Sequence, residues 1–182
     1  MRCFLALNPD KSQLDQVQAL MAKLSAHYQD WRPVKIDQLH LTLCFLGETD
    51  DEQLTKLVQG LPRLADKFKP IMFQAKKLIF LPNRHRPKLI AYHIEPSKQL
   101  MCLQKDIAQF LQKAEINFDH KEFRPHLTLG RLKKKGEIEK KSLPANINFS
   151  FTANSINLWQ SHLLASGAKY DLLAHFSFGQ YS

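Results

Sequence analysis

The chain has 182 residues, of which 44% are hydrophobic and 24% charged, as in an ordinary globular domain. Its three cysteines are widely spaced and form no CxxC pair, which excludes a disulfide framework and a zinc knuckle. No apolar run approaches the roughly 20 residues that a membrane-spanning helix needs. The net charge of +9 favours a polyanionic partner, with nucleic acid first and an anionic membrane surface second.

Hydrophobic periodicity divides the chain into interleaved strands and helices. Residues 2–7 are predicted to form a strand and are too short for a signal peptide, so we expect a cytoplasmic protein. A helix is expected over 13–26 with Ser12 as its N-cap, and two more helices begin at 49–52 and after Ser97. The other predicted strands cover 34–36, 39–47, 71–80, 89–94, 126–131, 149–160 and 168–178. Without a GxGxxG or Walker motif, a Rossmann or P-loop nucleotide site is a poor interpretation.

An internal repeat is the most informative feature of the sequence. The tetrapeptide His-Leu-Thr-Leu occurs at residues 40–43 and again, unchanged, at 126–129, close to half a chain length later. Successive side chains of a strand point to opposite faces, so the leucines of each copy should enter a core while its histidine and threonine share the other face. A duplicated lobe, with one such strand in each half, would bring both polar faces to one cleft.

Two histidines and two threonines in one cleft suit phosphodiester chemistry. A neutral imidazole activates a nucleophile and an imidazolium protonates the leaving oxygen, and both forms are accessible near neutral pH. We therefore predict His40 and His126 as an acid–base pair, with the Thr42 and Thr128 hydroxyls binding the phosphate oxygens. A single His-x-Thr in a strand is common and usually without function; the identical pair in opposite halves carries the hypothesis.

These motifs and their surroundings resemble the 2H phosphoesterase superfamily, which is defined by two His-x-Thr/Ser-x motifs. Within it, the chain looks like the RNA 2′,3′-cyclic phosphodiesterase branch, historically called 2′-5′ RNA ligase. The resemblance extends over most of the chain, and the segments that carry it are RCFLAL at 2–7, LHLTLCFLG at 39–47, FRPHLTLGR at 123–131, LWQS at 158–161 and GAKY at 167–170.

The resemblance implies an α+β fold, bilobal with pseudo-twofold duplicated lobes of antiparallel sheet, helices and a central groove between the lobes. Residues 1–182 would form a single 2H phosphoesterase domain made of two intertwined lobes. It also implies roles: His40 would donate a proton to the leaving O3′ and His126 would activate water, giving a 2′-phosphate. The spacing of the residues alone leaves open which histidine is acid and which is base.

Other residues are weaker candidates. Arg131 could bind phosphate from the end of its strand, although simple alternation turns it away from the His126 face. Phe45 is a candidate for base stacking, but such an aromatic is more often a core residue. The lysine-rich loop at 133–141 either follows an RNA backbone or is simply solvated. The remaining histidines form no ligand pattern, so we expect no metal and no cofactor.

Several functions stay open at this point. The first is hydrolysis of RNA 2′,3′-cyclic phosphate ends by a monomer, with reversible 2′-5′ ligation as the same chemistry run with a 5′-hydroxyl in place of water. A related alternative is a phosphodiesterase that acts on small cyclic nucleotides. A catalytically silent RNA-binding module and a metal-dependent nuclease are the alternatives from other classes.

Overall fold

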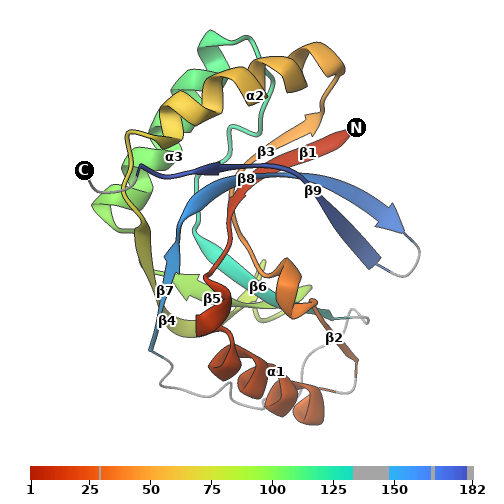
Figure 1. Cartoon of the computed structure of the whole chain (residues 1–182). Helices are drawn as coiled ribbons and strands as arrows, with labels where there is room; N and C mark the ends of the chain where they lie inside the picture. Colours follow the sequence, from red (N-terminus) through yellow and green to blue (C-terminus); the bar gives the residue numbers. More distant parts are fainter. Residues whose placement is uncertain (29, 133–147, 165–166, 180–182) are drawn as a thin grey trace.

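The computed structural model describes residues 1–28, 30–132, 148–164 and 167–179 (Figure 1). Its strands are β1 (Arg2–Leu7), β2 (Trp31–Pro33), β3 (Leu41–Glu48), β4 (Ile71–Leu81), β5 (Leu89–Ile94), β6 (His126–Leu132), β7 (Phe149–Ala153), β8 (Ser155–Leu164) and β9 (Gly167–Ser177). Its α-helices are α1 (Asp15–His27), α2 (Asp51–Ala65) and α3 (Lys98–Lys113), and short 3₁₀ turns are η1 (Lys11–Gln13) and η2 (Ile36–Gln38). None of these helices is both long and apolar enough to cross a bilayer.

The strands form one antiparallel sheet in the order β7-β4-β5-β6-β3-β1-β8-β9, with β2 pairing along β6. A single residue, Asn154, separates β7 from β8, yet these two strands lie far apart in the sheet order. The sheet must therefore curl until its β7 end approaches β8. The helices lie in two groups (Figure 1): α1 contacts β2, whereas α2 and α3 contact each other, α2 also contacts β9, and α3 contacts β3 and β4.

Three of the predicted elements differ from the structure. The strand expected over 34–36 lies earlier, at β2, and η2 follows it. The strand expected over 149–160 is two strands, because the backbone leaves β4 after Ala153 and Asn154 accepts a hydrogen bond from Phe178 instead. Ser12 does not cap α1: its hydroxyl donates to Asp10 at 2.6 Å, within η1, and α1 begins after Leu14 without a side-chain cap.

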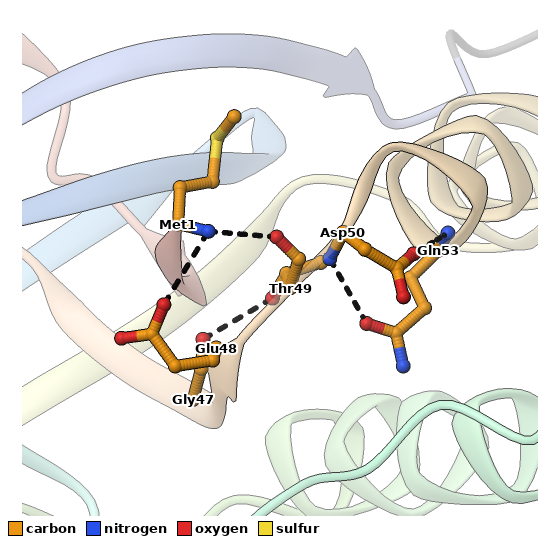
Figure 2. A network of polar contacts seen from close by, with 6 residues as sticks. All are labelled: Met1, Gly47, Glu48, Thr49, Asp50 and Gln53. Carbon is orange, nitrogen blue, oxygen red and sulfur yellow. Dashed lines mark hydrogen bonds and ion pairs between the residues drawn. The ribbon is translucent and has the colours of Figure 1, made fainter.

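The acidic start of the second helix is confirmed and joins β1, β3 and α2 at one corner (Figure 2). Asp50 Oδ1 accepts from the Gln53 backbone at 2.8 Å, while Gln53 Oε1 accepts from the Asp50 backbone at 3.1 Å, which is a capping box. The Met1 amino group donates to the Thr49 carbonyl at 2.8 Å, and its charge faces Glu48 at 3.4 Å. The residue that precedes β1 is thereby held against the end of β3.

The two halves of the sheet repeat one another, as the α+β, bilobal, duplicated fold predicts. The unit β1-α1-β3 corresponds to β5-α3-β6, and the two motif strands meet at the centre through the single register pair Leu41–Leu127. The matching pairs across each unit are Ala6–Thr42 with Ala91–Thr128, and Phe4–Phe45 with Leu89–Arg131. A pseudo-twofold axis therefore passes between β3 and β6.

Each motif strand carries a β-bulge that begins at the last residue of the tetrapeptide. In β3 the pairing with β1 skips Leu43, and in β6 the pairing with β5 skips Leu129. Two consecutive residues are buried at each bulge, Leu43 with Cys44 and Leu129 with Gly130. Because a bulge adds one residue, it reverses the alternation of the side chains that follow it. The residue after each bulge, Phe45 in β3 and Arg131 in β6, therefore returns to the face of the histidine.

At the bulge in β6, the side chain of Trp31 packs tightly on Gly130. A β-carbon at Gly130 would overlap the Trp31 indole at Nε1, Cε2 and Cζ2, and Trp31 is buried, with 5% of its surface exposed. We predict that Gly130→Ala lowers the free energy of unfolding by about 1–3 kcal/mol, measured by urea denaturation. In a Trp31→Phe background, where the smaller ring leaves space, the same substitution should cost less. An equal cost in both backgrounds would contradict this account of the contact.

Candidate active site

The two tetrapeptides line one cavity of about 610 Å³. His40 precedes β3 and His126 begins β6, and both reach the cavity together with Thr42 and Thr128. The leucines of both copies point the other way and are at most 3% exposed. The alternation predicted from the sequence is therefore present in both strands, and the central pairing of β3 with β6 brings the two polar faces together.

Both histidine rings are held in the same way. His40 Nδ1 lies 2.7 Å from the carbonyl of Gln38, and His126 Nδ1 lies 2.7 Å from the carbonyl of Arg124. A carbonyl oxygen only accepts, so each Nδ1 carries a hydrogen and donates it. This fixes the tautomer and leaves Nε2 as the nitrogen that can take up or release a proton. Each ring is thus oriented by the backbone carbonyl of the residue two positions before it.

The surroundings of the two rings differ. The His40 ring packs against Phe4, at 4.9 Å between ring centroids, and against Tyr170, at 5.1 Å, and these two rings contact each other edge to face at 5.3 Å. Burial among these aromatics is the main reason that the pKa of His40 is lowered to about 4. The hydrogen bond to Gln38 acts in the opposite direction, and the positive charges of His126 and Arg131 lower the pKa further.

Among the described residues, no aromatic ring contacts His126 as Phe4 and Tyr170 contact His40. The register position that Phe4 occupies in the first unit is occupied by Leu89 in the second. Both side chains line the cavity, so the aliphatic residue replaces the aromatic wall. Two histidines with the same backbone hydrogen bond therefore meet different environments, which is the condition under which one fold separates an acid from a base.

The threonines and the residues after the bulges complete the lining. Within the described residues, no hydrogen bond engages the hydroxyl of Thr42 or Thr128, so both are available to a ligand. Arg131 lines the cavity and is exposed. Simple alternation would turn Arg131 away, and the bulge at Leu129 brings it back. Phe45 occupies the equivalent place in the first unit, where it lines the cavity and is 53% exposed.

Other sequence candidates lie elsewhere. Both tryptophans, Trp31 and Trp159, are buried and belong to the core. The lysine-rich loop at 133–141 lies outside the described residues. In the part of the chain that the structure describes, no three His, Cys, Asp or Glu side chains are grouped as metal ligands.

Sequence reasoning missed several residues of the cavity. Phe4 and Tyr170 enclose His40, and Arg2 and the segment 117–119 line the wall beside Phe45. Tyr170 lies 130 positions from His40 in the sequence and comes from β9, so no local pattern could have paired them. Phe4 could have been found, because alternation in β1 places it on the face of Ala6, the register partner of Thr42.

The aromatic enclosure makes a prediction for the titration of His40. Replacing Phe4 by Leu gives the first unit the residue that the second unit has at the same position. Because the imidazolium is then better solvated, the pKa of His40 should rise from about 4 by about one unit. The measurement is an NMR titration of the imidazole carbon-bound protons in the wild type and in Phe4→Leu. Leu89→Phe is the matched control and should leave the His40 titration in place; movement of His40 in the control alone would refute the assignment.

Comparison with known proteins agrees with this geometry. The family model described as "LigT like Phosphoesterase" matches residues 7–92 and 94–170. Two curated relatives named "RNA 2′,3′-cyclic phosphodiesterase" are similar to the chain. The one from Bacillus subtilis is 31% identical over 144 residues, 75% of either chain, and the one from Archaeoglobus fulgidus is 30% identical over 135 residues, 74% of either chain.

Solved structures have the same fold as this chain. The protein TT0787 of Thermus thermophilus superposes over the full length of both chains with a TM-score of 0.81 at 26% identity. E. coli LigT, solved in complex with 3′-AMP, covers 98% of both chains with a TM-score of 0.72 at 21% identity, a likeness that concerns the fold alone. The match of the family model over most of the sequence, together with the paired histidine motifs, shows that the chain belongs to the LigT-like phosphoesterases of the 2H superfamily.

Proposed function

We propose that the protein hydrolyses 2′,3′-cyclic phosphate ends of RNA to 2′-phosphates. The observation that carries this proposal is the pair of equivalent histidines, His40 and His126, each with Nδ1 bound to a backbone carbonyl and with Nε2 left for proton transfer in one cavity. The names of the relatives, RNA 2′,3′-cyclic phosphodiesterase, support the same substrate.

The reaction requires one proton acceptor and one proton donor. As water attacks phosphorus, its proton passes to the Nε2 of one ring, the new P–O bond forms and the P–O3′ bond breaks. The electron pair of that bond goes to O3′, which takes a proton from the Nε2–H of the other ring. Following the resemblance, we assign the donor role to His40 and the acceptor role to His126.

That assignment has a physical condition. With a pKa of about 4, His40 is neutral in the empty cavity near pH 7, and a neutral ring has no Nε2 proton to donate. An anionic phosphate beside the ring favours its charged form and raises its pKa. In this proposal, His40 therefore takes up a proton from solvent when the anionic substrate binds, and the leaving O3′ receives that proton.

Hydroxyls and a guanidinium would stabilise the charge that develops on the phosphate. The Thr42 and Thr128 hydroxyls can each donate one hydrogen bond to a non-bridging oxygen. Arg131, which the β6 bulge turns into the cavity, adds a positive charge and a planar fork of donors. This set of groups supports a mechanism without a metal ion, which is also part of the proposal.

Ligation belongs to the same proposal. A 5′-hydroxyl in the place of water would be activated by the same acceptor and would leave a 2′-5′ linkage, so the described groups serve both reactions. We also propose that the protein acts as a monomer, because one chain supplies every residue of the cavity lining. The three free thiols favour the reducing environment of the cytoplasm.

The experiment that tests this function uses a short RNA with a 2′,3′-cyclic phosphate end, in the presence of EDTA. We expect the wild type to form a 2′-phosphate, and His40→Ala and His126→Ala each to be at least about 100-fold slower, since general acid or base catalysis is worth roughly 10²–10⁴-fold. His175→Ala removes an exposed histidine of β9 that is outside the cavity lining, and it is the matched control.

Other outcomes would redirect the assignment. Tight binding of the RNA with an unchanged end would favour the silent RNA-binding module. Turnover of mononucleoside cyclic phosphates alone would favour a small-nucleotide phosphodiesterase. Activity that EDTA abolishes would favour a metal-dependent nuclease and would contradict the two-histidine mechanism.

The pH dependence of kcat/KM offers a second test. In the reactive form the histidine pair holds one proton, whichever ring carries it, so the profile should be bell-shaped. Adding the second proton is opposed by the aromatic enclosure of His40, and the acid limb should therefore lie near pH 4, with loss of activity below it. A profile that is flat from pH 5 to 9, with chemistry as the slow step, would count against the pair.

A further inference from the structure

The cavity holds a second guanidinium far from the first. Among the described residues that line it, Arg131 on β6 and Arg2 on β1 are the arginines. Arg131 lies just after the second motif, whereas Arg2 lies four residues along β1 from Ala6, the register partner of Thr42. At roughly 3.3 Å per residue, this places Arg2 about 13 Å along the strand from the level of Thr42. The reaction centre does not account for a cation at that distance.

Aromatic surface lies between Arg2 and the histidines. Phe4 shares the Arg2 face of β1, and its register partner Phe45 is 53% exposed in the cavity with its ring centroid 6.0 Å away. Aromatic faces bind nucleobases by stacking, without regard to sequence. A nucleoside on Phe45 would therefore have the histidine pair on one side and Arg2 on the other.

Arg2 makes no ion pair within the described residues, and Figure 2 shows the carboxylate of Glu48 turned to the Met1 amino group. The register partner of Arg2 is Glu48, but the Glu48 carboxylate faces the Met1 amino group at 3.4 Å. The Met1 amine and carbonyl are both bound to the backbone of Thr49, at 2.8 and 2.7 Å. The chain on one side of Arg2 is thus fixed, while its exposed guanidinium stays available to an anion from solution.

The other carboxylate of this wall is also engaged. Asp119 lines the cavity beside Phe45, but Lys121 Nζ lies 2.8 Å from its Oδ2 and the Lys121 backbone donates to its Oδ1. The position that corresponds to Arg2 in the second unit is Pro87, two residues before Leu89, so the cation does not follow from the duplicated fold itself.

We propose that Arg2 binds the phosphodiester on the 5′ side of the terminal nucleotide while the histidine pair holds its cyclic phosphate. The cavity would then bind one nucleotide together with the phosphates on both sides of it. The protein would therefore prefer an RNA chain to a mononucleoside 2′,3′-cyclic phosphate. This inference rests on the proposed function and adds to it the feature that separates RNA from small cyclic nucleotides. A mononucleoside cyclic phosphate has no 5′ phosphate and gains nothing from Arg2.

The test compares two substrates with the same reacting end, adenosine 2′,3′-cyclic phosphate and the dinucleotide uridylyl-adenosine 2′,3′-cyclic phosphate. In the wild type, kcat/KM should be higher for the dinucleotide. In Arg2→Gln the ratio of the two kcat/KM values should fall about tenfold or more, the strength expected of one charge-assisted hydrogen bond. Arg2→Lys should retain part of the ratio, and Arg63→Gln on α2, an exposed arginine outside the cavity lining, should retain all of it.

Salt provides an independent readout. A lost phosphate contact should reduce the slope of log kcat/KM for the dinucleotide against log salt by about 0.7, with no such change for adenosine 2′,3′-cyclic phosphate. An unchanged ratio in Arg2→Gln, or an equal loss on both substrates, would overturn the inference. If the wild type cleaves neither substrate, the proposed function fails instead. Calorimetric binding of uridylyl-adenosine 2′-phosphate and adenosine 2′-phosphate to wild type and Arg2→Gln then decides the role of Arg2 alone.

Discussion

The pairing of β3 with β6 at Leu41 and Leu127 is the constraint on which the site depends. It is the one register pair between the two motif strands, and it joins the halves of the sheet at their centre. Because both leucines are fully buried, a slip of either strand by one residue would expose its leucines and bury its histidine. The hydrophobic core of each half therefore fixes the register, and the register fixes where the imidazoles meet.

Around this centre the two halves share a backbone and differ in chemistry. Both histidines donate Nδ1–H to the carbonyl two residues earlier, and both motif strands bulge after the tetrapeptide. The side chains at corresponding positions then diverge: Phe4 corresponds to Leu89 across the pseudo-twofold axis, and Phe45 corresponds to Arg131. One half presents aromatic surface and the other a cation, so an approximately symmetric fold can bind an asymmetric substrate and assign unlike roles to like residues.

The sequence predicted those parts of the site that depend on local periodicity. The repeat at 40–43 and 126–129, interpreted with strand alternation, was sufficient to predict that His40 and His126 share a cavity with the threonines. It was insufficient for Arg131, because alternation holds only until a bulge, and a bulge at Leu129 and Gly130 depends on the neighbouring strand β5. The sequence could not predict Tyr170 for a related reason. Its contact with His40 is made across the curled sheet, between residues that no periodicity connects. The break at Asn154 was missed because the chain changes partner strands without a glycine or proline to mark the change.

In the proposed mechanism, the aromatic enclosure of His40 also determines how proton transfer and substrate binding are coupled. A ring with a pKa of about 4 in the empty cavity resists protonation mainly because the charged form is poorly solvated there. A phosphate anion replaces the missing solvation with a direct charge contact, so it stabilises the imidazolium where water cannot. Neutral ligands of the same shape do not provide that contact, and they leave His40 unable to donate. In the proposed mechanism, the enclosure ties the presence of the acid to the presence of the anion on which it acts, through the two side chains, Phe4 and Tyr170, that contact the His40 ring.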